Sequence, residues 1–547
     1  MTNNTKLLEK VKFDSISDAL HYSAQTEKKV SFFSPDGELI SETPYRQLQE
    51  LSIEIAKRLN TLGFKRYARI GLIADTDLQF LIFFYACQHA GLVPCPLPYV
   101  SYAGGEQAYI DRLALMSKNA NLSTIIGPED IRFCLVQAAK TCKIHAYSFG
   151  ELTEERKSGD IAPLGKDDPA YIQYSSGSTS DPKGIWLTQH AVTSNIAMIL
   201  EYGSQSLPSD HTFSWLPFFH DMGFAGLVLT PMFGISGVDF ISPSTFARNP
   251  SLWVKLMSER RSTVTYAPSF AYALAAKIQN AYPQSYDLSS LRLAGIGGDM
   301  IRLSELQAFA KAFSDCSFRE ESFLPSYGMS ESVLGIAFHP SGEKIFTHNL
   351  EPKSLPLVSC GYAPPGINLK IVDQNEKEVP EQTVGHILVH APDLMTSYLN
   401  DEETTQAAMR TDGYRDTGDM GYLINGRLVI TGRAKELILW RGRNIWPQDI
   451  EQILEQADTL VQKAVAFSVE ENDEEKIIAF VQTDEKDASK QEILTQTLAT
   501  ALFSYLGIPA KIIFVSPNEI PYTQTGKLSR IHARNSYLKN YTPTDHL

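Results

Sequence analysis

Short apolar runs typical of buried strands alternate with longer apolar runs typical of helices over most of the first four hundred residues. Residues 68–74, ARIGLIA, form a short run rich in branched side chains, and residues 79–90, QFLIFFYACQHA, are long enough for a buried helix. Parallel strands need a crossover between them, which a helix usually supplies. The pattern therefore predicts an α/β architecture with largely parallel sheets.

The last hundred or so residues have a different pattern. Helices are predicted at residues 447–455, which open with proline, and at 495–506, and short strands at 427–431, 437–440, 463–469, 476–481 and 511–515. We therefore expect a large N-terminal α/β domain of several subdomains, followed by a small C-terminal α+β domain. A charged stretch near residues 431–436 places the bounds at 1–432 and 433–547.

Composition excludes several classes of protein. The chain has 547 residues, 43% of them hydrophobic, which is enough to bury a large core. Its formal net charge of −14 argues against non-specific nucleic-acid binding, although a local cluster of lysine and arginine could still bind an anion. The N-terminus has no secretory apolar segment, and the most apolar run, residues 80–93, is too short to span a bilayer. The six cysteines are scattered without a Cys-x-x-Cys pair, which favours reduced thiols in a cytoplasmic protein.

Residues 174–184, YSSGSTSDPKG, have the composition of a phosphate-binding loop. Glycines let backbone N–H groups face an anion, while hydroxyl groups add donors and Lys183 adds a positive charge. The loop lies between two predicted strands, at residues 170–174 and 185–188, whereas a Walker loop opens a helix. The same composition is typical of a flexible surface turn, so the loop alone leaves both interpretations open.

Five motifs in order resemble those of the adenylate-forming superfamily, which includes acyl-CoA synthetases, peptide-synthetase adenylation domains and luciferases. They are YSSGSTSDPKG at 174–184, PSYGMSES at 325–332, YRDTGDMG at 414–421, GRAKELILWRGRNIWPQDIE at 432–451 and TQTGKLSR at 523–530. Three more segments resemble the fatty acyl-AMP ligases of that superfamily: SWLPFFHDMGFAG at 214–226, APSFAYAL at 267–274 and LVSCGYAPPG at 357–366. One departure is Gly297-Gly298-Asp299-Met300, where relatives usually carry Gly-Ala-Glu-Pro, which leaves the contact with the nucleotide base there open.

The resemblance implies a nucleotide site that binds ATP and Mg²⁺. It assigns the phosphates to Ser175, Ser176, Gly177, Ser178, Thr179 and Lys183, and other nucleotide contacts to Gly298, Asp299, Ser326, Tyr327, Gly328, Met329 and Ser330. In the same way Asp419 would bind both ribose hydroxyls, and Arg433 would contact the nucleotide. Glu331 would be the Mg²⁺ ligand, since Mg²⁺ prefers hard oxygen donors. Lys527 would be the catalytic lysine, and Lys435 the hinge between domains.

The acyl site is expected to be apolar and elongated. His220 and Asp221 suggest a catalytic dyad, but adenylation needs no nucleophilic side chain, so we expect them to orient the carboxylate or border the pocket. Trp215, Phe219, Met222 and Phe270 are candidates for its wall, and each could equally belong to the core.

The leading hypothesis is an ATP-dependent ligase of fatty acid metabolism that makes fatty acyl-AMP and releases pyrophosphate. Transfer to a separate acyl carrier protein, of a polyketide or peptide synthase, would follow. The nearest alternative is a fatty acyl-CoA synthetase. Residues 338–359 look longer than in CoA-forming relatives and resemble the insertion typical of the AMP ligases, although long surface loops are also tolerated without a role. A non-catalytic acyl or nucleotide sensor would share the fold, but Glu331, Asp419 and Lys527 argue against it.

Overall fold

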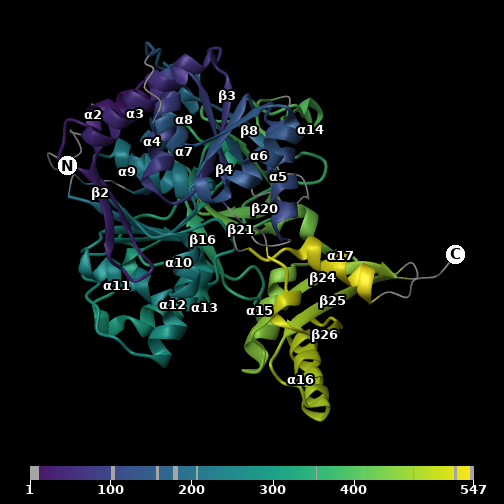
Figure 1. Cartoon of the computed structure of the whole chain (residues 1–547). Helices are drawn as coiled ribbons and strands as arrows, with labels where there is room; N and C mark the ends of the chain where they lie inside the picture. The colour runs from purple at the N-terminus through teal and green to yellow at the C-terminus, as the bar shows by residue number, and fades with distance from the viewer. Residues whose placement is uncertain are drawn as a thin grey trace.

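The structure is a computed structural model of the chain (Figure 1). It describes residues 12–99, 105–154, 159–175, 183–204, 207, 209–352, 354–410, 412–471, 474–522 and 527–541. Within these ranges no helix has both the length and the apolar character needed to cross a membrane.

Two largely parallel sheets organise the large N-terminal part (Figure 1). The first has the order β14 (Gly335–Phe338), β13 (Phe323–Gly328), β12 (Leu293–Ile296), β11 (Val264–Ala267), β9 (His211–Ser214), β10 (Gly237–Phe240), β1 (Lys29–Phe33) and β2 (Leu39–Pro44). Only its outermost pairs, β13 with β14 and β1 with β2, are antiparallel. The second is parallel throughout, in the order β4 (Val93–Pro98), β3 (Arg69–Ala74), β5 (Thr124–Gly127) and β6 (His145–Ser148).

Helices connect and cover these strands, as the alternating pattern predicts. They include α2 (Ile16–Ser23), α3 (Tyr45–Leu59), α4 (Leu78–Ala90), α5 (Gly105–Asn119), α6 (Arg132–Cys142), α7 (Phe149–Glu154), α8 (Gln189–Met198), α9 (Thr230–Phe233), α10 (Pro243–Arg248), α11 (Ser251–Glu259), α12 (Ser269–Ala281) and α13 (Leu303–Ala312). Two π-helices, η3 (Ile199–Gly203) and η4 (Met222–Leu229), interrupt this part.

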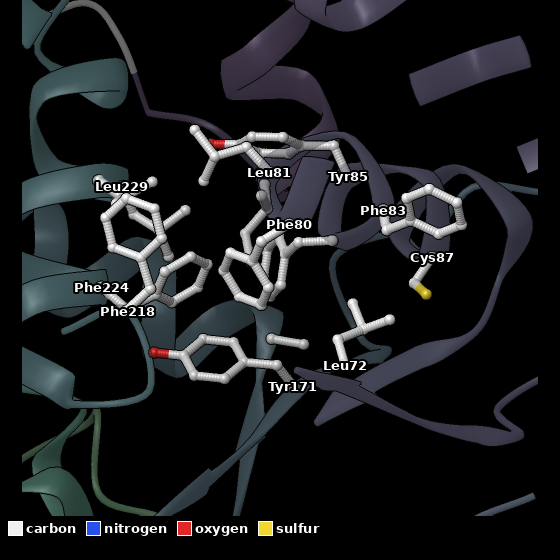
Figure 2. Close-up of a cluster of buried hydrophobic side chains, with 14 of the residues drawn as sticks. Leu72, Phe80, Leu81, Phe83, Tyr85, Cys87, Tyr171, Phe218, Phe224 and Leu229 are labelled. Atoms are coloured by element: carbon white, nitrogen blue, oxygen red, sulfur yellow. The ribbon is translucent and has the colours of Figure 1, made fainter. Parts of the chain in front are cut away.

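Helix α4 lies in the middle of the largest core cluster, which Figure 2 shows in close-up. Every α4 side chain from residue 80 to residue 90 is buried, which explains why the helix has no polar face. Phe84 contacts Phe224 of η4 edge-on, with ring centroids 4.5 Å apart. Phe218 packs against Phe80 in the same cluster, with centroids 5.7 Å apart. The loop before η4 is thus anchored to the core.

A third sheet is antiparallel, contrary to the prediction of mainly parallel strands. Its order is β15 (Thr347–His348), β16 (Leu357–Gly361), β21 (Arg427–Arg433), β20 (Arg415–Ile424), β18 (Gly385–His390) and β17 (Asn368–Val372). Between residues 357 and 433 only one helix, α14 (Glu402–Ala408), occurs in the described part, and neighbouring strands such as β20 and β21 are joined by a tight turn. Without long crossovers, adjacent strands pair antiparallel.

The C-terminal part is a small α+β unit with its own core, as predicted. Its sheets are β22 (Ile438–Trp440) with β23 (Arg443–Ile445), and β24 (Lys463–Glu471), β25 (Glu474–Gln482) and β26 (Lys511–Val515). Helices α15 (Pro447–Ala457), α16 (Ala488–Leu506) and α17 (Arg530–Asn540) pack with them. Figure 1 shows this unit beside β20 and β21 of the large part.

Candidate active site

A cavity of about 740 Å³ lies between the large part and the small unit. On the large part it is bordered by residues that directly follow β12 and by the carboxyl end of β13, two parallel neighbours. In α/β sheets, ligands bind at this carboxyl edge. Lys527 and Arg530 line the cavity from the small unit. The site is therefore completed only when the two parts come together.

Most of the residues expected from sequence line this one cavity. They are Ser175, Lys183, His220, Asp221, Met222, Gly298, Asp299, Ser326, Tyr327, Gly328, Met329, Ser330, Glu331, Asp419, Arg433, Lys435 and Lys527. Four phosphate-loop residues, Ser176, Gly177, Ser178 and Thr179, lie outside the described residues. The three aromatic candidates Trp215, Phe219 and Phe270 are not among the lining residues.

Of these three aromatic side chains, Trp215 is buried in the core, and Phe219 and Phe270 are partly buried and pack against it. The ring of Trp215 stacks on Phe246 with centroids 3.8 Å apart, and Phe270 meets Trp215 edge-on at 6.3 Å. Phe219 packs against the cluster around α4. The apolar part of the cavity is lined instead by Ile199, Met222, Leu227, Val264, Leu334 and Phe338, most of which belong to η3, η4, β11 and β14.

Asp419 is the centre of one hydrogen-bonded group in the cavity. Tyr327 Oη donates to Asp419 Oδ2 at 2.6 Å, and Arg433 Nε lies 3.0 Å from Asp419 Oδ1. Burial raises the pKa of Asp419, while the Arg433 guanidinium and the Tyr327 hydroxyl oppose that rise. Asp419 in turn raises the pKa of Arg433. Each carboxylate oxygen still has an acceptor position, because an ionised carboxylate offers about four in all.

His220 and Asp221 form a second polar group, at the start of η4. His220 Nδ1 lies 2.7 Å from Asp221 Oδ1, and Ser330 Oγ donates to Asp221 Oδ2. Burial opposes ionisation of Asp221, but His220, Ser330 and Lys527 together hold its pKa well below its usual range. Asp221 is therefore a carboxylate, and its interactions fit positioning rather than proton abstraction.

Lys527 lines the same cavity as these two polar groups. Its ammonium stabilises the ionised forms of both Asp221 and Asp419. These carboxylates belong to different segments of the large part, whereas Lys527 belongs to the small unit. An ammonium in this place can neutralise charge on reacting anions.

Lys183 and Glu331 belong to a third polar group of the cavity. Lys183 Nζ lies 3.0 Å from Thr404 Oγ1 and 3.4 Å from Asp401 Oδ2, so α14 and its cap hold this ammonium. The Glu331 carboxylate accepts a hydrogen bond from Tyr398 Oη at 2.5 Å and lies 3.5 Å from Arg415 Nη2. Sequence reasoning missed Tyr398 and Arg415, which both line the cavity.

The family model for AMP-binding enzymes matches residues 22–399, well over half of the chain. The chain belongs to the AMP-binding enzyme family. The family's C-terminal domain model matches residues 442–534. This AMP-binding enzyme is 34% identical to a Caulobacter vibrioides protein named "Putative acyl-CoA synthetase", with 96% of both chains covered.

Two further relatives of this AMP-binding enzyme bear on its substrate. It is 27% identical to the medium-chain-fatty-acid–[acyl-carrier-protein] ligase JamA of Moorena producens, over 97% of this chain and 96% of JamA. A solved structure from work on fatty acyl-adenylate ligases of E. coli and L. pneumophila superposes with a TM-score of 0.90 at 34% identity. That superposition covers 97% of this chain and 98% of the solved one.

Proposed function

We propose that this AMP-binding enzyme activates a fatty acid with ATP to fatty acyl-AMP, releases pyrophosphate and passes the acyl group to an acyl carrier protein. The observation that carries the proposal is the cavity itself. It is lined by the polar group around Asp419, by apolar side chains that include Leu227 and Phe338, and by Lys527, whose charge favours the ionised forms of Asp419 and Asp221. That arrangement suits a ligand with a nucleotide at one end and a hydrocarbon chain at the other.

The reaction needs charge compensation more than it needs a nucleophile from the protein. An oxygen of the fatty carboxylate attacks the α-phosphorus, and the bond to the β-phosphate oxygen breaks, so that pyrophosphate leaves. Lys527 would stabilise the negative charge on the carboxylate and the α-phosphate as they approach. Tyr327 would pack against the adenine and Asp419 would accept from the ribose hydroxyls. Lys183 with Ser175 would hold the phosphates, and His220 would orient the carboxylate.

The residues present fit a magnesium ion that is bound together with the nucleotide. Mg²⁺ typically takes one or two carboxylates plus substrate phosphates and water. Glu331 offers one such carboxylate, and the described residues include no group of three or more metal ligands that would form a cage without the nucleotide. When bound, Mg²⁺ would neutralise charge on the phosphates.

Support for transfer to a carrier protein comes from the relatives and from the segment between β14 and β16. Two relatives are named as ligases that act on acyl carrier protein, JamA and TtuA of Teredinibacter turnerae. Within the segment, Leu355 packs against the core of the small unit, while Ile345, Phe346, Leu350 and Leu357 pack against the large part. Such a segment would favour the arrangement that makes the adenylate over the one that forms a thioester.

An acyl-CoA synthetase is the second candidate function, because the Caulobacter vibrioides relative carries that name.

We also propose that the hinge between the two parts is Lys435, with the domain boundary between residues 432 and 433. The location we propose is the cytoplasm, since none of the six cysteines forms a disulfide.

The test of adenylation is product analysis with ATP, Mg²⁺ and a panel of fatty acids of different chain length. We expect one pyrophosphate released per acyl-AMP found by mass spectrometry, and none without fatty acid. A protein that binds ATP but releases no pyrophosphate with any acid would instead be the non-catalytic sensor.

A further inference from the structure

Tyr398 lies between two cations beside the candidate metal ligand. Its strand, β19 (Ser397–Tyr398), pairs with β8 (Gly184–Thr188), which follows the phosphate loop and also pairs with β7 (Pro169–Tyr174). Arg415 Cζ lies 5.1 Å from the centroid of the Tyr398 ring, and Lys183 Nζ lies 5.3 Å from it. Both distances are within the range of cation–π attraction. The ring therefore links the phosphate side of the cavity to β20.

The hydrogen bonds of Tyr398 run in one direction. Arg415 Nη2 lies 2.6 Å from Tyr398 Oη, and a guanidinium can only donate. The phenol oxygen is thus the acceptor of that bond and gives its own hydrogen to Glu331 Oε1, 2.5 Å away.

Arg415 depends on this chain of bonds. The residue is 2% exposed, and its Nε and Nη1 have no hydrogen-bond partner among the described residues. A buried charge without compensation is strongly destabilising. Glu331 is the acid closest to the guanidinium, with Oε1 3.5 Å from Nη2. Arg415 and Glu331 therefore compensate each other, with Tyr398 between them.

We infer that Arg415 and Tyr398 are positioning residues that hold Glu331 by its Oε1, so that Oε2 remains for a divalent cation bound with the nucleotide phosphates. The inference rests on the proposed function, because it takes the nucleotide site as given. Oε2 accepts no hydrogen bond from the described residues. Neither positioning residue need touch the cation, since residues that hold a metal ligand in place act through it.

Cation binding tests this without any turnover. Mn²⁺ serves as the probe, in the presence of α,β-methylene-ATP, which cannot be cleaved between its α- and β-phosphates, and free Mn²⁺ is measured by electron paramagnetic resonance. Tyr398→Phe removes only the hydroxyl and keeps the ring between its two cations. We expect it to weaken Mn²⁺ binding about tenfold or more, the usual effect of losing a group that orients a metal ligand. Binding of the analogue without metal should be almost unchanged.

The matched control is Tyr109→Phe. Tyr109 is buried in α5, donates one hydrogen bond, to the Pro98 carbonyl at 3.0 Å, and does not line the cavity. This variant should bind Mn²⁺ as the unmodified protein does. Thermal unfolding of both variants checks that each one folds.

A double-mutant cycle tests whether Arg415 and Tyr398 act on Glu331 through the same series of hydrogen bonds. Arg415→Met removes the donor to Tyr398, and its loss of Mn²⁺ affinity should not add to that of Tyr398→Phe, because both interrupt the same path. Additive losses, or unchanged Mn²⁺ affinity in Tyr398→Phe, would overturn the inference and leave the proposed function standing. A wild-type chain that binds neither the analogue nor Mn²⁺ would overturn both.

Discussion

Lys527 is the residue on which the proposed chemistry depends most. Its ammonium reaches the site only from the small unit and influences Asp221 and Asp419 together. We expect Lys527→Ala to lower the rate of pyrophosphate release by about a hundredfold or more, the usual effect of losing one preorganised charge. The variant should unfold at the same temperature as the wild type.

The control for this substitution is Lys539→Ala, in the exposed last turn of α17 of the same unit, which should leave the rate unchanged. A rate for Lys527→Ala within a few-fold of wild type, or about 1 kcal/mol of activation free energy, would show that another group supplies the charge.

Asp393, at the edge of the site, leads to a prediction about how the stability of the fold depends on pH. It is 2% exposed and accepts a hydrogen bond from Asn195, which also binds the backbone of the cavity residue Gly335. Burial raises the pKa of Asp393 to about 6. Folding therefore favours the protonated acid, and this stabilisation is lost as pH rises from about 4 to 6. Above that window the ionised group destabilises the fold by at most about 3 kcal/mol.

Asp393→Asn should accordingly raise the apparent unfolding temperature at pH 8. The difference between variant and wild type should shrink as pH falls through 6 towards 4. The gain will be less than the full electrostatic amount, because Oδ1 of Asp393 has no partner among the described residues and the new amide would leave a donor there. A difference that does not change with pH would contradict the raised pKa.

At the scale of elements, the segment between β14 and β16 decides between the two candidate functions. Leu355 packs against the core of the small unit, whereas Leu350 packs against the large part. We expect Leu355→Ser to weaken the adenylate-forming arrangement. Losing ~1.5 kcal/mol of apolar burial would raise acyl-CoA output by up to about tenfold.

Leu350→Ser is the matched control, because it removes the same side chain from the same segment without touching the small unit. Equal acyl-CoA output from both variants would mean that the segment's contact with the small unit does not set the outcome. Loss of adenylation in Leu350→Ser alone would point to a folding role for the segment.

Sequence reasoning worked best for features that one short stretch of sequence determines. Helix α4 and strand β3 follow directly from local apolar runs, and short motifs pick out Tyr327, near the carboxyl end of β13, and Asp419, in the middle of β20. Tyr398 and Arg415 were missed, since their bond to Glu331 joins residues far apart in sequence through sheet pairings that no local pattern encodes. The sequence around Trp215 does not show whether its side chain lines a pocket or belongs to the core, because aromatic side chains occur in both places.

At the scale of the whole molecule, the structure holds the arrangement in which Lys527 lines the cavity. Arg302 of the large part pairs with Glu455 and lies 3.6 Å from Glu451, both on α15, and Arg530 of α17 also binds Glu451. Glu451 is fully buried in this network. The two Arg302 pairs join the large part to the small unit, so they would have to separate for the small unit to turn about the segment η8 (Ala434–Glu436), which contains Lys435.

Lys435→Pro tests that rotation. Proline fixes φ and removes an N–H group, so it should restrict a hinge more than it disturbs the arrangement already formed. We expect acyl transfer to a carrier thiol to fall several-fold more than pyrophosphate release does, with each half-reaction measured separately. Equal losses in both half-reactions would move the hinge away from this position.

The most direct test of the account is where the acyl group goes when both acceptors are offered. The wild-type protein would be incubated with ATP, Mg²⁺, a fatty acid, saturating CoA and a carrier protein bearing its phosphopantetheine thiol, and the products followed by mass spectrometry. We expect acyl-AMP and acyl-carrier protein, with little acyl-CoA. Efficient acyl-CoA formation by the unmodified chain would contradict it and identify a fatty acyl-CoA synthetase.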